Sequence, residues 1–381
     1  MNKFDINYSD NIINDIKEKI SNFNWENLPD FSNWDLGVNK EVLRDICNHW
    51  ITNYSWKKEE KKLNSFNHYS AEVDDLNIHF VYEKGKSPNA IPLLISHGWP
   101  GSFLEFNKII GPLTNPKQYG LDDSICFDLV IPSIPGFVFS SAPKHPYGPR
   151  KIASYYDKLM TDVLNYKNYY AQGGDWGGAI STWLGYDHFK NCKGIHLNIM
   201  IVRDKGGPQN EEEKYWQKRF KQEQILEEGY RTMQATKPQT LACAMIDNPI
   251  GVAAWILEKF YGWSDLREKS LKEVYGYDDL ITNIMLYIVT NSFNTASWIY
   301  YGRREEGGRS LPKKRLPIKV PTAIAKFPKE YLEWAPKSYV KRIYNVKRWT
   351  EMPRGGHFAA LEEPDLLIKD IKDFSKTITI S

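Results

Sequence analysis

The stretch Gly173–Gly178, with the sequence GGDWGG, decides the fold because it sets a carboxylate among glycines where a strand should meet a helix. It follows the run Tyr-Tyr-Ala-Gln over 169–172, which we take as a strand, and precedes a helix-forming stretch that starts at Ala179. Glycines beside Asp175 let strand and helix approach more closely than a Cβ would allow. A carboxylate in such a turn predicts a nucleophile that forms an ester with its substrate. The alternative is a glycine-rich turn in which Asp175 only caps the helix.

Outward from this turn, short apolar runs alternate with stretches of helical spacing. Strands are expected at 91–96, 127–132, 169–173 and 194–202, with helices at 102–113 and 152–164. The same rhythm returns later, with strands expected at 318–325 and 343–351 and a helix at 364–374. Such alternation is typical of a parallel sheet that is covered by helices on both faces. The expected fold class is therefore α/β.

The N-terminal part of the chain is expected to be mostly helical. Apolar side chains recur at helical spacing over 12–20 and again over 42–54. Residues 72–82 are rich in alternating and β-branched side chains, which predicts a pair of strands. We assign residues 1–75 to an N-terminal module and residues 76–204 to the first part of the α/β core.

A second helical region interrupts the α/β core. The expected helices here are 211–227, 249–259 and a single long helix over 280–301. Because no strand pattern occurs between 205 and 310, we assign these residues to a helical cap that is inserted into the core. Residues 311–381 then complete the core.

Composition and charge exclude several classes of protein. Lys and Arg number 50 against 47 Asp and Glu, so a net charge of +3 is too small to grip a nucleic acid by charge alone. Four scattered cysteines without a C-x-x-C pair indicate neither a disulfide framework nor a thiolate zinc site. The chain has neither a run of about 18 apolar residues nor the apolar segment of a secretory signal. We therefore expect a cytoplasmic protein without a membrane span.

A second motif, HGWPG over 97–101, follows the strand expected at 91–96. Backbone N–H groups in this place can join the N–H after the nucleophile to form an oxyanion hole. The two donors would be the backbone N–H groups of Trp99 and Trp176. For His97 we prefer a structural role that holds the loop over a catalytic role.

A third motif, RGGHF over 354–358, lies between the last expected strand and the last expected helix. A loop histidine in this place, His357, is suited to act as a general base. The chain order of nucleophile, acid and histidine requires an acid after a late strand. Glu330 follows the strand expected at 318–325 and fits this order, whereas Asp204, after the strand expected to end at Val202, is the competing acid.

Together these motifs resemble those of the microsomal-type epoxide hydrolase family, which includes the juvenile-hormone epoxide hydrolases. The matching segments are HGWPGS at 97–102, PSIPGF at 132–137, GGDWGG at 173–178, GYRTMQATKP at 229–238, NPIGVAAWILEKF at 248–260 and RGGHFAALEEP at 354–364. The resemblance extends over essentially the whole chain, including the N-terminal module. It implies an α/β-hydrolase fold with a helical cap and an N-terminal helical module.

The resemblance also implies an activity, the conversion of an epoxide to a vicinal diol through an ester on Asp175. Two cap tyrosines would donate hydrogen bonds to the epoxide oxygen, because an alkoxide leaves poorly unless a donor stabilises it. Tyr230 matches the first of them, and Tyr300 is aligned to the second with the adjacent Tyr301 as an alternative. His357, oriented by Glu330, would then activate water against the ester.

The expected substrate is a small lipophilic epoxide, such as a metabolic intermediate, and neither a cofactor nor a metal is implied. The number of subunits is open, with a homodimer as one option. Many animal members of the family carry an N-terminal membrane anchor, which is not expected here. Two rival functions stay open: a haloalkane dehalogenase, which would need halide-binding donors in place of the cap tyrosines, and a non-catalytic ligand-binding protein on the same scaffold.

Overall fold

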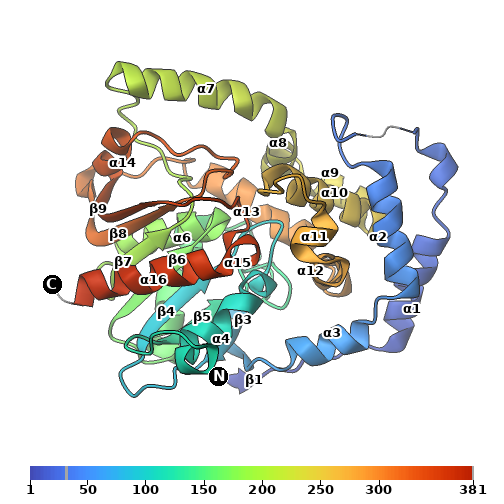
Figure 1. Ribbon diagram of the computed structural model, residues 1–381, viewed down its shortest axis with the longest axis horizontal. Coiled ribbons are helices and arrows are strands. Elements are labelled where there is room, and N and C mark those ends of the chain that lie inside the picture. The colour runs from blue at the N-terminus through green and yellow to red at the C-terminus, as the bar shows by residue number, and fades with distance from the viewer. Residues whose placement is uncertain (31–32, 380–381) are drawn as a thin grey trace.

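The computed structural model describes residues 1–30 and 33–379, and in this part of the chain nine strands form one sheet (Figure 1). The strands are β1 (Asn2–Lys3), β2 (His68–Val73), β3 (Leu76–Glu83), β4 (Ile91–Ser96), β5 (Phe127–Pro132), β6 (Tyr169–Gly173), β7 (Cys192–Leu197), β8 (Ile318–Lys326) and β9 (Tyr344–Glu351). Their spatial order is β1-β2-β3-β5-β4-β6-β7-β8-β9. Pairing is antiparallel from β1 to β5 and parallel from β5 to β9.

Helices cover both faces of the sheet, which explains why its central strands are apolar on both sides. The main covering helices are α4 (Asn107–Thr114), α5 (Pro149–Lys158), α6 (Asp175–Asp187) and α16 (Pro364–Thr379). Helices α4 and α16 contact each other, and α5 packs against α6, which lies along β6 and β7. All six residues of β5 are buried, as expected for a strand between two helical layers. The α/β-hydrolase fold predicted from the sequence is confirmed.

Helices dominate the region between β7 and β8, which adds no strand to the sheet. It contains α7 (Glu211–Glu227), α8 (Gly229–Thr236), α9 (Pro238–Met245), α10 (Pro249–Trp263), α11 (Leu271–Tyr275), α12 (Tyr277–Val289) and α13 (Phe293–Glu305). The single helix expected over 280–301 is wrong, because α12 ends and α13 begins within it. Asn291, in the break, has a φ of 52°, a left-handed conformation that ends a helix and that Asn adopts more readily than most residues.

The strand expected over 194–202 is also shorter than predicted. Strand β7 ends at Leu197, the last of its residues that pairs with β8. Residues 199–202 are apolar and buried although they form no strand. A short apolar run reports burial and cannot by itself distinguish a strand from a buried loop. The helix expected over 102–113 begins as a 3₁₀ turn over Phe103–Phe106 before α4.

The N-terminal helices pack against the helices between β7 and β8 and lie away from the centre of the sheet (Figure 1). They are α1 (Asp10–Ser21), α2 (Lys40–Thr52) and α3 (Trp56–Leu63). Helices α1 and α2 both contact α10, and α2 and α3 both contact α12. The buried face of α1 carries Ile13, Ile16 and Ile20, which is the spacing predicted from the sequence. The N-terminal segment therefore braces the inserted helices from the outside.

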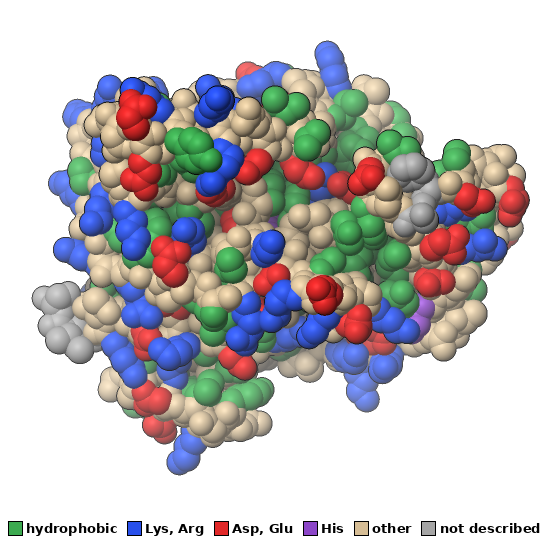
Figure 2. Space-filling view, turned by 45° about the horizontal axis from the view of Figure 1, so that its top comes forward, with side chains coloured by type: hydrophobic (Ala, Val, Ile, Leu, Met, Phe, Trp, Pro, Cys, Tyr) green, Lys and Arg blue, Asp and Glu red, His purple; other side chains and the backbone are tan. Residues whose placement is uncertain are grey.

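The surface is of mixed charge. In Figure 2, Lys and Arg side chains are interspersed with Asp and Glu over the face that is drawn, which accords with the small net charge. In residues 1–30 and 33–379, no helix has both the length and the apolar character needed to cross a membrane.

Candidate active site

The GGDWGG turn joins β6 to α6 and holds Asp175 in a strained backbone conformation. Asp175 has a φ of 41°, close to the left-handed region that residues other than glycine rarely adopt. A Cβ on Gly177 would lie 1.8 Å from the carbonyl oxygen of Ser96, at the end of β4. A Cβ on Gly98 would lie 2.1 Å from Oδ1 of Asp175. Glycine is therefore required at both positions. The close approach that the two glycines allow holds the Asp175 carboxylate against the loop after β4.

Two backbone N–H groups point at the Asp175 carboxylate. The Trp99 N–H donates to Oδ1 at 2.8 Å, and the nearby Trp176 N–H also acts to lower the pKa of this carboxylate. Burial raises the pKa of Asp175, and the imidazole of His357 and the two N–H groups oppose that rise. If Asp175 forms an ester, these N–H groups would face the negative charge that develops on it, as the oxyanion hole predicted from the sequence requires.

His357 lies between two carboxylates. Its Nε2 is 3.6 Å from Oδ2 of Asp175, and its Nδ1 is 3.0 Å and 2.9 Å from the two carboxylate oxygens of Glu330. A hydrogen bond of 3.1 Å from the Lys329 N–H to the Gly355 carbonyl joins the loops that carry Glu330 and His357. The three side chains are nearly inaccessible to solvent, with exposed fractions of 5 to 7%.

The charge of His357 depends on these carboxylates. Burial alone would lower its pKa, but the Glu330 and Asp175 carboxylates more than offset burial and raise the pKa to about 9. At neutral pH the ring is therefore an imidazolium whose Nδ1–H donates to Glu330. Removal of the negative charge on Asp175 would therefore lower the pKa of His357.

The competing acid, Asp204, lies in a different set of contacts. Arg342 donates from Nε to its Oδ2 at 2.9 Å, and the Gly206 N–H donates to its Oδ1 at 3.0 Å. The structure thus brings Glu330 to His357 and leaves Asp204 in an ion pair beneath α7. The strand that was expected to present Asp204 ends seven residues before it, at Leu197.

His97 holds the loop after β4 in place. The Ile134 N–H donates to its Nε2 at 3.2 Å, and its Nδ1 lies 3.0 Å from the Gly98 carbonyl oxygen. Burial lowers the pKa of His97 to about 4, so the ring is neutral and its proton is on Nδ1. Its contacts are those of a structural residue, which is the role preferred from the sequence.

The two predicted cap tyrosines reach the site from α8 and α13. The Tyr230 ring stacks on Trp99 with centroids 5.2 Å apart, and the Tyr300 ring meets Trp176 edge-on at 4.6 Å. Each tyrosine thus packs against one of the residues that supply the backbone donors. The ring of the adjacent Tyr301 instead lies against the Arg304 guanidinium, which is 4.4 Å from the ring centroid.

The Tyr300 hydroxyl has an unusual environment. It lies near the Trp176 indole and the Tyr230 hydroxyl, yet it forms no hydrogen bond with any residue that the structure describes. Burial raises the pKa of Tyr300 well above its ordinary value, so the hydroxyl keeps its proton. An unpaired buried hydroxyl costs about 1–3 kcal/mol. A ligand oxygen that accepts from Tyr300 would recover that free energy.

Two aromatic residues of the site were missed by the sequence reasoning. Tyr331 directly follows Glu330, and its hydroxyl is 3.1 Å from that of Tyr230. Trp263, at the end of α10, stacks on Tyr331 at 4.2 Å and meets His357 edge-on at 5.0 Å. The adjacency of Tyr331 to Glu330 was a signal in the sequence, whereas Trp263 lies just beyond the matching segment that ends at residue 260.

A cavity of about 10 Å³ borders both Asp175 and His357. Its polar lining also includes Gln172, Asn198 and Glu105. Gln172 donates from Nε2 to Asn198 at 2.9 Å, while its Oε1 has no partner among the described residues. Burial raises the pKa of Glu105 to about 8, so this carboxyl is mostly protonated at neutral pH. A cavity of this size with several polar walls suits one water molecule.

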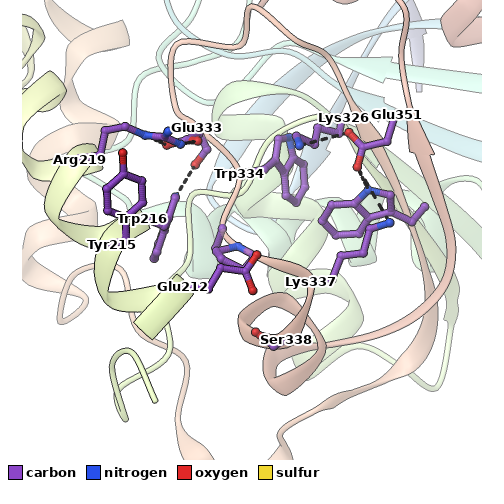
Figure 3. Close-up of a pocket in the computed structure, with 13 residues that line it drawn as sticks. Glu212, Tyr215, Trp216, Arg219, Lys326, Glu333, Trp334, Lys337, Ser338 and Glu351 are labelled. Atoms are coloured by element: carbon purple, nitrogen blue, oxygen red, sulfur yellow. Dashed lines mark hydrogen bonds and ion pairs between the residues drawn. The ribbon is translucent and has the colours of Figure 1, made fainter. Parts of the chain in front are cut away.

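A larger pocket of about 450 Å³ lies outside this site, between α7 and the segment 333–338 (Figure 3). Its walls are aromatic and charged, and they are distinct from the residues around Asp175. In the described parts of the chain, no three His, Cys, Asp or Glu side chains are grouped so that they could hold a metal ion.

Comparisons with known proteins agree with the resemblance seen in the motifs. The family model described as "Epoxide hydrolase N terminus" matches residues 1–106, and the model described as "alpha/beta hydrolase fold" matches residues 91–224. The chain is 36% identical to "Epoxide hydrolase 1" of Oryctolagus cuniculus, over 97% of this chain and 88% of that protein. It is 35% identical to "Juvenile hormone epoxide hydrolase 2" of Ctenocephalides felis, over 97% of this chain and 84% of that protein.

Solved structures give the same result. The juvenile hormone epoxide hydrolase of the silkworm Bombyx mori superposes with a TM-score of 0.88 at 29% identity, covering 99% of this chain and 94% of that chain. The epoxide hydrolase of Aspergillus niger superposes with a TM-score of 0.85 at 29% identity, covering 99% and 96%.

Proposed function

The chain belongs to the epoxide hydrolase family, and from this premise we propose that it converts an epoxide to a vicinal diol through a covalent ester on Asp175. One arrangement carries the proposal. His357 and the backbone N–H of Trp99 both face the Asp175 carboxylate, and Glu330 contacts the other side of the His357 ring. As a member of this family the protein is an enzyme that acts on epoxides. The residue roles below are part of the proposal.

In the first step a carboxylate oxygen of Asp175 attacks one epoxide carbon and the carbon–oxygen bond of the ring breaks. The electron pair of that bond moves to the epoxide oxygen, where Tyr230 and Tyr300 donate hydrogen bonds and one supplies a proton. The unpaired hydroxyl of Tyr300 supports this role, because a substrate oxygen would supply the acceptor that the hydroxyl lacks. The product of this step is a hydroxyalkyl ester.

In the second step the neutral ring of His357 takes a proton from water, and the resulting hydroxide attacks the carbonyl carbon of the ester. The bond from that carbon to the substrate oxygen then breaks, that oxygen takes the remaining proton of the water, and the diol leaves Asp175 as a carboxylate. Formation of the ester has removed the negative charge of Asp175, so the pKa of His357 should fall from its value of about 9 in the free enzyme. The proton that the ring then loses replaces the one that the tyrosine gave to the epoxide oxygen. Glu330 keeps the ring oriented and stabilises the imidazolium that forms. The N–H groups of Trp99 and Trp176 face the oxyanion.

The cavity beside Asp175 and His357 supplies a place for the attacking water. Its volume of about 10 Å³ suits a single molecule, and the unpartnered Oε1 of Gln172 offers an acceptor in its wall. The protonated carboxyl of Glu105 can donate a hydrogen bond to the same molecule.

The helical segment 205–310 is proposed to act as a cap, because it supplies both tyrosines and Trp263. We keep the division into an N-terminal module over 1–75 and a core over 76–204 and 311–381. The indole and phenol rings of the tryptophans and tyrosines at this site pack against one another, and such apolar surroundings favour a lipophilic epoxide over a charged one. No cofactor takes part in this mechanism.

The proposal is tested with a panel of lipophilic epoxides and haloalkanes, with diol measured by mass spectrometry and halide release measured in parallel. Wild-type protein should form diol, and Asp175→Ala should abolish it while leaving the melting temperature within a few degrees. Halide release without diol would identify a dehalogenase. The absence of turnover on the whole panel would point to a ligand-binding protein.

A further inference from the structure

Tyr331 connects the cap tyrosines to the loop that carries Glu330. Its ring lies flat on Trp263, with the centroids 4.2 Å apart and the planes 7° from parallel. The same ring meets His357 edge-on at 5.1 Å. Its hydroxyl is 3.1 Å from the hydroxyl of Tyr230. Two aromatic contacts therefore hold the phenol ring of Tyr331 in the position from which its hydroxyl bonds to Tyr230.

The two cap tyrosines differ because of this contact. The Tyr300 hydroxyl forms no hydrogen bond in the described parts of the chain, whereas the Tyr230 hydroxyl is bonded to Tyr331. Burial raises the pKa of Tyr331 well above its ordinary value, and the pKa of Tyr230 is raised for the same reason, so both keep their protons. Two hydroxyls that share one hydrogen bond can be arranged in two ways, since either can donate.

The direction of this bond decides whether Tyr230 can act on a substrate. If Tyr230 donates to Tyr331, its proton is occupied. If Tyr331 donates, the proton of Tyr230 is free to turn toward the epoxide oxygen, and the bond that its oxygen accepts makes Tyr230 a stronger donor. An epoxide oxygen is an acceptor without a proton, so its arrival selects the second arrangement.

We propose that Tyr331 is a positioning residue for epoxide opening, whose O–H donates to the oxygen of Tyr230 and directs the Tyr230 proton to the epoxide oxygen. Tyr331 keeps its own proton and does not touch the substrate. This inference rests on the proposed function and adds to it a third tyrosine, which lies outside the cap.

The segment that follows Tyr331 is anchored to α7, which keeps the phenol in place. Figure 3 shows Trp216 and Arg219 of α7 turned toward Glu333. The Trp216 indole N–H donates to the Glu333 carbonyl oxygen at 3.4 Å, and Arg219 forms an ion pair with the Glu333 carboxylate. Preorganisation of this kind lowers the entropic cost of holding the hydroxyls of Tyr331 and Tyr230 in one geometry.

The test is a double-mutant cycle on Tyr331→Phe and Tyr230→Phe, followed by single-turnover kinetics that separate ester formation from ester hydrolysis. Phenylalanine retains the ring that stacks on Trp263 and removes only the hydroxyl. Tyr331→Phe should slow ester formation by about 3- to 10-fold, the effect of one hydrogen bond of about 1 kcal/mol. It should leave ester hydrolysis unchanged. Tyr344→Phe is the matched control, because it also removes a buried hydroxyl that bonds to another hydroxyl, that of Thr182 at 3.0 Å.

The decisive comparison is made in the Tyr230→Phe background, where no hydroxyl remains for Tyr331 to direct. There Tyr331→Phe should change the rate of ester formation by less than about twofold, as strong coupling between the two sites requires. An equal loss in both backgrounds would mean that Tyr331 acts on the substrate directly and would overturn the inference. A loss confined to ester hydrolysis, or no loss at all, would also overturn it. Failure of wild-type protein to form any ester would instead refute the proposed function.

Discussion

Replacing Glu330 by Gln keeps the shape of the side chain and removes the charge that orients His357. The carboxylate lies 2.9 Å and 3.0 Å from Nδ1, and it is the main group that raises the pKa of His357 from 6.5 to about 9. At 1.36 kcal/mol per pKa unit, that rise corresponds to about 3 kcal/mol of support for the imidazolium. Loss of most of this support should slow ester hydrolysis by on the order of 10², and a wrong ring tautomer could extend the loss to on the order of 10⁴.

The assay is rapid quench of a single turnover, followed by the intact mass of the protein. Glu330→Gln should accumulate a species heavier by one substrate molecule, because Asp175 still attacks while hydrolysis is slow. Asp204→Asn is the matched control, since Asp204 is paired with Arg342, away from His357, and this variant should turn over at close to the wild-type rate. If Asp204→Asn accumulates the ester and Glu330→Gln does not, the assignment of the acid is wrong.

Three further predictions concern the donors, the turn and the charge of the base. Tyr300→Phe should slow ester formation by on the order of 10²–10³, measured by single turnover, whereas a large effect of Tyr301→Phe alone would move the role to Tyr301. Gly177→Ala should give little folded protein by circular dichroism, since its Cβ would lie 1.8 Å from a carbonyl oxygen of β4, and a normal melting temperature would contradict this. Because the pKa of His357 is raised in the folded state, its contribution to stability is present below pH 6.5 and lost as pH rises through about 9. The melting temperature of His357→Gln should therefore fall less than that of wild type between pH 7 and pH 9, and equal falls would argue against an imidazolium in the resting enzyme.

The parts of the site that could be predicted from the sequence are those with a local backbone requirement. The glycines around Asp175 and the loop of Trp99 are needed where a Cβ would clash, so their pattern is visible without any knowledge of the fold. Glu330 and His357 could be chosen because an α/β-hydrolase has a fixed chain order of nucleophile, acid and histidine, with the acid and the histidine in loops that follow late strands. The same logic offered Asp204, which the structure places seven residues beyond the end of β7 and in contact with Arg342.

The remainder depends on contacts between segments that are distant in the chain. Tyr331 reaches Tyr230 across 101 residues, and no periodicity or local motif encodes such an approach. The break between α12 and α13 depends on the left-handed backbone conformation of Asn291, which the spacing of apolar residues does not predict. A single acid in a helical stretch usually lies on a solvated face, so the sequence does not distinguish Glu105, which borders the cavity beside Asp175.

The central claim is that Asp175 forms the ester, and isotope incorporation tests it most directly. Wild-type protein in excess over an epoxide is allowed one turnover in ¹⁸O-water and is then digested for mass spectrometry. Hydrolysis at the ester carbonyl carbon should leave ¹⁸O in the carboxylate of the peptide that contains Asp175, and the diol from that first turnover should carry an unlabelled oxygen from the protein. Label found in the diol alone, with the Asp175 peptide unlabelled, would show that water attacks the epoxide directly and would contradict the account.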